Sequence, residues 1–338
     1  MGDMTAPATF PLGPFRPYEG NPILRPRGES WESGNLYNPA AIVVDGEVLL
    51  LYRAHADDLV SHVGLARSKD GYTFVREAAP ILSPEHDYES MGCEDPRVTL
   101  IDGTYYLTYT GYDGQTAQLC LATSTDLHVW TKYGPILPAG YDTFRPLTGE
   151  HGRTWSKAGV IAPEPIAGRY YLYFGEGAIF YATSTDLINW TPGDNDAPIH
   201  RPTPGSWDEK LVEIGAPPVI TDNGLMIFLS NGARDGRTTG VDYRCGQFAI
   251  ASSDPTTVIA ATTSPWLRPQ TYEERHGLVS NVTFVEGLVW LEDRWLAYYG
   301  QSDTTLAVAE YVPGQDSYGA ETPPVRSHRW ADPGGSAI

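Results

Sequence analysis

In residues 94–109 the chain reads Glu-Asp-Pro-Arg-Val-Thr-Leu-Ile-Asp-Gly-Thr-Tyr-Tyr-Leu-Thr-Tyr. Two acids and an arginine precede an alternating apolar run, an Asp-Gly turn and a second strand-like run, which together predict a β-hairpin. Because neighbouring strand residues point to opposite faces, Glu94 and Asp95 should not face the same way, and Pro96 restricts the backbone after them. Most acid pairs before a hairpin lie in solvated turns. Recurrence of the pattern along the chain would indicate that this pair belongs to a repeated structural unit.

The pattern does recur. Five units, each with an apolar strand, a turn, a second strand rich in aromatic or aliphatic residues and a third strand, follow one another along the chain. They begin near Asn38, Glu94, Lys157, Glu213 and Asn281. The third strand ends in Ala-Thr-Ser-Thr-Asp both at 122–126 and at 182–186. A period of about 60 residues with about four short strands is typical of the blades of a β-propeller.

We therefore predict an all-β chain folded as a five-bladed β-propeller over residues 38–315. A Pro- and Gly-rich N-terminal arm (1–37) precedes it and a C-terminal tail (316–338) follows it. The alternative is a β-sandwich in which the turn spacing is coincidental. The near-verbatim repeat of the third-strand ending favours the propeller.

Composition agrees with short strands joined by turns. The 338 residues include 21 Tyr, 9 Trp, 35 Gly and 28 Pro, and they are enough to bury a large core. The net charge of −19 argues against nucleic acid and anionic membranes as partners, whereas a neutral ligand meets no such repulsion. Three widely spaced cysteines and eight scattered histidines predict no disulfide framework, no metal site and no cofactor. With no signal-like or membrane-length apolar run, we expect a soluble, cytoplasmic protein, and its oligomeric state stays open.

The propeller prediction indicates where polar residues should meet. The first strand of each blade lines the central channel, so residues at the start of each repeat converge on the axis. These are Asn38, Glu94, Asp95, Lys157, Glu213 and Asn281, with Glu286 slightly further along and with Arg53 and Arg97 nearby. A water-filled polar channel is the structural interpretation. A concentrated acidic cluster is costly to assemble, which favours a ligand site.

Three segments carry a family resemblance. Gly92-Cys93-Glu94-Asp95-Pro96-Arg97, Asn38-Pro39-Ala40 and Tyr52-Arg53-Ala54 resemble the signature of glycoside hydrolase family 130. That family comprises β-mannoside phosphorylases and β-mannosidases built on five-bladed propellers. The resemblance implies that Asp95 is the general acid, and that Asn38, Arg53 and Asp303 hold the non-reducing mannosyl unit.

The chain departs from the family pattern at the positions where the phosphorylases bind phosphate. The phosphorylases resembled here carry three cations for phosphate, at positions that in this chain appear as Glu176 (or its neighbour Gly175), Glu213 and Asn231. A phosphate dianion near two carboxylates would be repelled by about 1–4 kcal/mol per pair at 4 Å. Lys157 and Arg153 remain as anion ligands for the alternative, a phosphorylase.

These departures predict an inverting, exo-acting glycosidase that releases mannose from neutral β-manno-oligosaccharides, with β-1,2 linkages suggested by the glutamate-bearing members of the resembled family. An inverting mechanism needs an acid and a base roughly 6.5–9.5 Å apart, and clustered carboxylates should raise one another's pKa. The expected catalytic residues are Asp95, Glu176 and Glu213; the expected substrate-binding residues are Asn38, Arg53, Glu94, Arg97, Lys157, Asn281 and Asp303. Besides the phosphorylase, which would produce mannose 1-phosphate, a non-catalytic carbohydrate-binding propeller is the other alternative.

Overall fold

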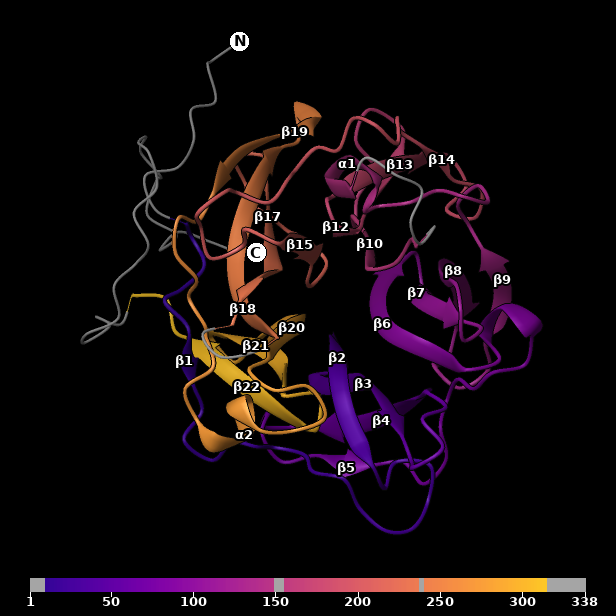
Figure 1. The fold of residues 1–338 in the computed structure, drawn as a ribbon, viewed down its shortest axis with the longest axis vertical. Coiled ribbons are helices and arrows are strands. Elements are labelled where there is room, and N and C mark those ends of the chain that lie inside the picture. Colours follow the sequence, from indigo (N-terminus) through magenta and orange to yellow (C-terminus); the bar gives the residue numbers. More distant parts are fainter. Residues whose placement is uncertain (1–9, 149–154, 237–239, 315–338) are drawn as a thin grey trace.

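The structure is a computed structural model that describes residues 10–148, 155–236 and 240–314. Five antiparallel sheets follow one another around a central axis, so the chain is a five-bladed β-propeller, as predicted (Figure 1). The expected C-terminal tail and Arg153 lie outside the described residues. Within the described ranges, no helix is long and apolar enough to cross a membrane.

Each blade consists mainly of four strands. Blade one contains β2 (Asn35–Val44), β3 (Glu47–His55), β4 (His62–Ser68) and β5 (Val75–Arg76), and blade two contains β6 (Gly92–Ile101), β7 (Thr104–Tyr112), β8 (Ala117–Ser124) and β9 (Thr131–Pro135). Blade three contains β10 (Gly159–Ile161), β11 (Tyr170–Phe174), β13 (Phe180–Ser184) and β14 (Thr191–Pro192). Blade four contains β15 (Leu211–Ile214), β17 (Leu225–Asp235), β18 (Val241–Ala251) and β19 (Asp254–Ala261), with β12 (Glu176–Gly177) and β16 (Val219–Ile220) attached. Blade five contains β20 (Thr283–Leu291), β21 (Arg294–Gln301), β22 (Thr305–Tyr311) and β1 (Arg16–Pro17). Short helical turns occur at η1 (Asp87–Glu89), α1 (Arg145–Thr148) and α2 (Tyr272–Arg275).

The Asp-Gly turns of the sequence form the first hairpins of blades one and two. Asp45 and Gly46 have φ of 50° and 78°, and Asp102 and Gly103 have φ of 48° and 78°. Positive φ at both central residues is the geometry of the two-residue turn whose twist matches the flanking strands, and Asp-Gly is among its preferred sequences. These turns fix the register that sends the start of each inner strand toward the axis.

The N-terminal arm closes the ring. Strand β1 pairs with β22 as the outermost strand of blade five, with Arg16 opposite Glu310. The Asn21 amide donates to the backbone carbonyl of Val308 (2.9 Å) and accepts from its N–H (3.0 Å). The propeller therefore includes part of the segment expected to be a separate arm, because a ring of blades needs its two ends joined.

Apolar packing between neighbouring blades forms the core. Five clusters are buried, each shared mainly by two blades. Phe10, Leu12 and Phe15 of the arm pack with residues of blades four and five, which adds an apolar contribution to ring closure.

Candidate active site

Strand irregularities place the axis residues. The β2–β3 ladder shifts between Tyr37 and Pro39, the β6–β7 ladder between Glu94 and Arg97, and the β20–β21 ladder between Val285 and Gly287. These are β-bulges, which bend a strand and re-aim its side chains. Asn38 and Asp95 adopt left-handed φ of 51° and 49°, and Glu286 is the unpaired residue of the third bulge.

A strand that changes blades brings the two predicted glutamates together. Between β11 and β13 the chain leaves blade three, and β12 pairs with the inner strand β15 of blade four, with Glu176 opposite Glu213. Gly175 and Gly177 flank Glu176 with φ of 134° and 95°, conformations that favour glycine. Residues directly opposite in an antiparallel pair have neighbouring side chains, so the two carboxylates face the same region.

One part of the cluster reaches solvent. Arg53 donates from Nη1 to Asp95 Oδ1 (2.9 Å) and from Nη2 to Glu94 Oε1 (2.5 Å). Its Nε donates to Ser61 Oγ (2.8 Å), and its guanidinium lies 4.5 Å from the ring centre of Tyr37. The side chains of Arg53 and Glu94 retain 15% and 11% exposure, so this guanidinium fixes both acids at a place that solvent reaches.

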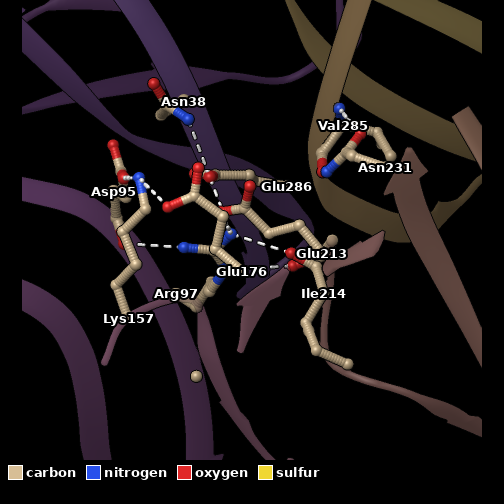
Figure 2. Close-up of polar contacts among 12 residues, drawn as sticks. Asn38, Asp95, Arg97, Lys157, Glu176, Glu213, Ile214, Asn231, Val285 and Glu286 are labelled. Carbon is tan, nitrogen blue, oxygen red and sulfur yellow. Dashed lines mark hydrogen bonds and ion pairs between the residues drawn. The ribbon is translucent and has the colours of Figure 1, made fainter. Parts of the chain in front are cut away.

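Lys157 connects two of the expected catalytic carboxylates. Its Nζ lies 3.6 Å from Asp95 Oδ2 and 3.2 Å from Glu176 Oε2 (Figure 2). Burial lowers the pKa of Lys157, but Glu176, Glu213 and Asp95 outweigh that effect and raise it well above its usual value. Lys157 is therefore a cation whose charge is already shared by the site's own acids.

A fully buried layer lies next to this part. Arg97 Nη2 is 2.8 Å from Glu286 Oε1 and 3.8 Å from Glu213 Oε1, and Asn38 Nδ2 donates to Glu286 Oε1 (2.8 Å) (Figure 2). The remaining Arg97 donors reach the backbone carbonyls of Asp95, Ile214 and Gly215. With a side chain 1% exposed and its donors engaged by other blades, Arg97 ties the blades together, and its expected role as a sugar ligand stays a prediction.

The proton distribution differs from the expected one. Burial would raise the pKa of Asp95, but Arg53 and Lys157 outweigh burial and lower it to about 2. Burial raises the pKa of Glu94 and of Glu213, the latter well above its usual range, although Arg53 and Lys157 respectively oppose it. Burial also raises the pKa of Glu286 to about 8 and that of Asp303 to about 6. Several acids of the cluster therefore have raised pKa values, but Asp95, the residue expected to be the general acid, does not.

Other predicted residues are placed as follows. Asn281 precedes the inner strand, and its backbone carbonyl accepts a hydrogen bond from Tyr243 N (3.0 Å); the blade-five residue that joins the cluster is Glu286. Asn231, the neutral replacement for a phosphate cation, binds the backbone of Val285 at both ends of its amide, at 2.9 and 2.8 Å. It joins blades four and five (Figure 2).

The sequence predicts Glu286 near the axis but not as a catalytic or substrate-binding residue. Asn38 and Asp95 lie seven residues before the first residue of the turns at 45–46 and 102–103, whereas Glu286 lies six residues before the first residue of the turn at 292–293. Counting back from the turn therefore locates Asn38 and Asp95 and comes within one residue of Glu286.

Fold and site together define a class of protein: a five-bladed propeller with acids and cations gathered on its axis, the arrangement of a carbohydrate-active enzyme. The chain belongs to glycoside hydrolase family 130, whose model, described as beta-1,4-mannooligosaccharide phosphorylase, matches residues 17–313. Enzymes of this family act on β-mannosides.

The named relatives divide on the reaction. A 1,2-beta-oligomannan phosphorylase from Thermoanaerobacter sp. (strain X514) is 36% identical over 300 residues, which cover 85% of this chain and 94% of that protein. A beta-1,2-mannobiose phosphorylase from the same organism is 32% identical, with coverage of 85% and 94%. A solved structure described as "The GH130 family of mannoside phosphorylases contains glycoside hydrolases that target beta-1,2 mannosidic linkages in Candida mannan" is 32% identical, covers 91% of this chain and 96% of its own, and has a TM-score of 0.80. The curated relatives support phosphorolysis better than the hydrolysis that the sequence favours.

Proposed function

We propose that this protein is an exo-acting enzyme that removes terminal β-1,2-linked mannose from neutral manno-oligosaccharides by hydrolysis, with inversion. The family membership supports a β-mannoside substrate, and the names of the relatives support the β-1,2 linkage. The choice of water as nucleophile rests on one observation, the opposed pair of Glu176 and Glu213.

The opposed glutamates suit the binding of water better than that of phosphate. Glu176 Oε2 and Glu213 Oε1 are buried and accept no hydrogen bond from the described residues, although Lys157 Nζ lies 3.2 Å from the first and Arg97 Nη2 lies 3.8 Å from the second. A carboxylate oxygen has more than one lone pair, so each can also accept from a water molecule. A phosphate dianion would instead face two carboxylates, while the nearby cations Lys157 and Arg97 are already in contact with acids.

Glu176 is the better candidate for the base. It lies 3.2 Å from Lys157, whereas burial raises the pKa of Glu213 well above its usual range and so disfavours the carboxylate form that a base needs. Because Lys157 contacts both, Asp95 Oδ2 and Glu176 Oε2 are at most about 7 Å apart, so only the lower end of the roughly 6.5–9.5 Å typical of inverting enzymes is open to them.

Asp95 remains the proposed general acid. That role requires a protonated carboxyl, so binding of the substrate has to raise the pKa of Asp95. Its low pKa comes from Arg53 and Lys157, and the Lys157 contact is the longer of the two. A sugar that displaces Lys157 from Asp95 and excludes water would raise the pKa of Asp95 and allow it to carry a proton.

Phosphorolysis is the second candidate, and the names of the curated relatives favour it. It requires phosphate to bind where Lys157 now contacts Glu176, with that lysine turning from the carboxylate to the anion.

Product analysis separates the two reactions. Incubation with β-1,2-mannobiose should give free α-mannose at a rate independent of phosphate. NMR spectra recorded before the anomers equilibrate identify the anomer released. Asp95→Asn is the inactive control, with an expected loss of about 10²–10⁴-fold. Accumulation of mannose 1-phosphate, with a rate that rises with phosphate, establishes the phosphorylase instead; binding of mannobiose without turnover establishes a carbohydrate-binding propeller.

A further inference from the structure

A buried carboxylate that the proposed mechanism does not use lies directly before the strand that carries Asp95. Glu89 ends the helical turn η1, three residues ahead of the first residue of β6, and it is 0% exposed. It contacts β6 through Cys93, whose side chain should point to the face opposite that of Glu94 because neighbouring strand residues alternate.

Every contact of this carboxylate is a hydrogen bond that it accepts. Lys132 Nζ (2.6 Å) and the backbone N–H of Glu85 (2.9 Å) donate to Oε1. Tyr109 OH (2.8 Å) and Cys93 Sγ (3.3 Å) donate to Oε2. The Lys132 side chain is only 4% exposed, so this is a buried ion pair whose geometry the surroundings fix.

A hydrogen bond from a tyrosine hydroxyl to a buried glutamate also occurs in two other blades. Glu32 accepts a hydrogen bond from Tyr52 OH (2.7 Å) in blade one, and Glu274 accepts one from Tyr299 OH (3.0 Å) in blade five. In all three blades the acid precedes the inner strand and the tyrosine belongs to the second strand. The recurrence indicates that these acids anchor the segment leading into the inner strand.

In blade two, the strand that Glu89 anchors carries a residue in a strained backbone conformation. Asp95 holds a left-handed φ of 49°, a conformation that costs roughly 1–2 kcal/mol for a residue with a Cβ and persists only when its surroundings hold it. On the axis side, Arg97 Nη1 donates to the Asp95 carbonyl (3.1 Å) and Arg53 holds its carboxylate. On the other face, the strand before the bulge is held by Glu89 at the side chain of Cys93.

We propose that Glu89, held by Lys132 and Tyr109, is a positioning residue that fixes the bulge bearing Glu94 and Asp95 and so sets where the Asp95 carboxylate points. The catalytic consequence rests on the proposed function, in which Asp95 protonates the leaving group. The effect on the position of Asp95 does not depend on that function.

Glu89→Gln is the direct test. The amide nitrogen either faces Lys132 and the Glu85 N–H, which cannot accept, or it requires the Tyr109 hydroxyl and the Cys93 sulfur to accept instead of donating. In both orientations the negative charge that pairs with Lys132 is lost. A displacement of Asp95 should lower kcat/KM for β-1,2-mannobiose by roughly 10–100-fold. The same variant should retain nearly full kcat/KM on 4-nitrophenyl β-mannoside, whose leaving group needs no proton.

Tyr109→Phe and Tyr298→Phe form a matched pair. Each removes one buried tyrosine hydroxyl that donates a hydrogen bond, to Glu89 at 2.8 Å and to the Gly71 carbonyl at 2.9 Å respectively. Tyr109→Phe should lower the mannobiose-to-aryl ratio of kcat/KM in the same direction as Glu89→Gln, by a smaller factor. Tyr298→Phe should leave that ratio unchanged even where it lowers the unfolding temperature.

Crystal structures of Glu89→Gln and Tyr109→Phe provide a measurement independent of activity. A shift of the Asp95 carboxylate away from Arg53 supports the proposal, even if the wild type cleaves neither substrate and the proposed function fails. An unmoved Asp95, or equal loss on both substrates in an active enzyme, overturns it.

Discussion

At the scale of single residues, two acids that the sequence treats as equivalent are different in the structure. Glu176 and Glu213 lie opposite each other, yet Glu176 contacts Lys157 at 3.2 Å while Glu213 is more deeply buried and has a raised pKa. Glu176 is therefore the proposed base, because burial disfavours the ionised form of Glu213.

This difference predicts unequal effects of the same substitution. Glu176→Gln should lower kcat by about 10²–10⁴-fold because the amide cannot accept the proton of the attacking water. Glu213→Gln should have a smaller effect, since an amide resembles the protonated carboxyl it replaces. Azide should restore turnover to Glu176→Gln and yield an inverted glycosyl azide detectable by NMR. Rescue of Glu213→Gln alone would reverse the two roles.

Glu286 predicts a pH dependence of stability. Its pKa is raised from 4.5 to about 8 by burial, so between these values the folded protein retains a proton that the unfolded chain releases. Stability should therefore fall as pH rises through this window, by roughly 1–4 kcal/mol in total. Glu286→Gln keeps an acceptor for Asn38 and Arg97 and removes the titration. Urea unfolding at pH 5 and pH 8 should show the variant gaining stability relative to wild type at the higher pH; a constant difference would contradict the assignment.

At the scale of elements, the two-residue strand β12 is what assembles the site. It takes Glu176 out of blade three and pairs it with blade four, and Gly177 makes the exit possible. A Cβ on Gly177 would lie 2.8 Å from the Phe144 ring, in addition to the cost of its φ of 95°. Thr143 Oγ1 donates to the Glu176 carbonyl (2.7 Å) and holds β12 from the same loop.

Gly177→Ala should therefore displace Glu176 and lower kcat at least tenfold, because about 1 Å of misplacement in a catalytic group can cost about 10²-fold. Gly168→Ala is the matched control: its φ is 78°, so it also carries backbone strain, but a Cβ there meets nothing within 4 Å. Both variants should lose about 1–2 kcal/mol of stability, measured by urea unfolding. Equal activity in the two would mean that β12 tolerates the added methyl group.

At the scale of the whole molecule, stability depends on joining the first and last parts of the propeller. Asn21 satisfies both backbone groups of Val308, and the apolar residues of the arm pack against blades four and five. The ring is thus closed by both hydrogen bonds and buried apolar surface.

Asn21→Ala should destabilise the protein by about 1–3 kcal/mol, because it leaves the Val308 N–H without its partner and removes one of the two donors to the Val308 carbonyl, which keeps the Tyr18 N–H at 2.9 Å. Asn189→Ala, which removes an exposed amide that donates to Asp186, is the control and should change stability by less than about 0.5 kcal/mol. Urea unfolding monitored by tryptophan fluorescence compares the two; equal midpoints would show that ring closure does not depend on the Asn21 amide.

The fold could be predicted from the sequence because local signals repeat. Asp-Gly turns, paired aromatic strands and the period of the repeat each indicate a propeller. Asn38 and Asp95 lie at the starts of the first two repeat units. The crossing of β12 was not predictable from local patterns, since Gly-Glu-Gly gives no indication of a partner on another blade. The buried position of Arg97 and the proton states of the acids depend on neighbours brought from other blades, which no local pattern encodes.

Ring closure by β1 also constrains how the protein can be made on the ribosome. The segment around Arg16 and Pro17 is synthesised before the other described strands, whereas its partner β22 follows all of them. Phe10, Leu12 and Phe15 must therefore remain without their final neighbours during most of translation, exposed to aggregation or chaperone binding. A circular permutant that begins at Asn35 and carries the arm after β22 would make the closing strand the last piece synthesised, and it should shorten that exposed interval.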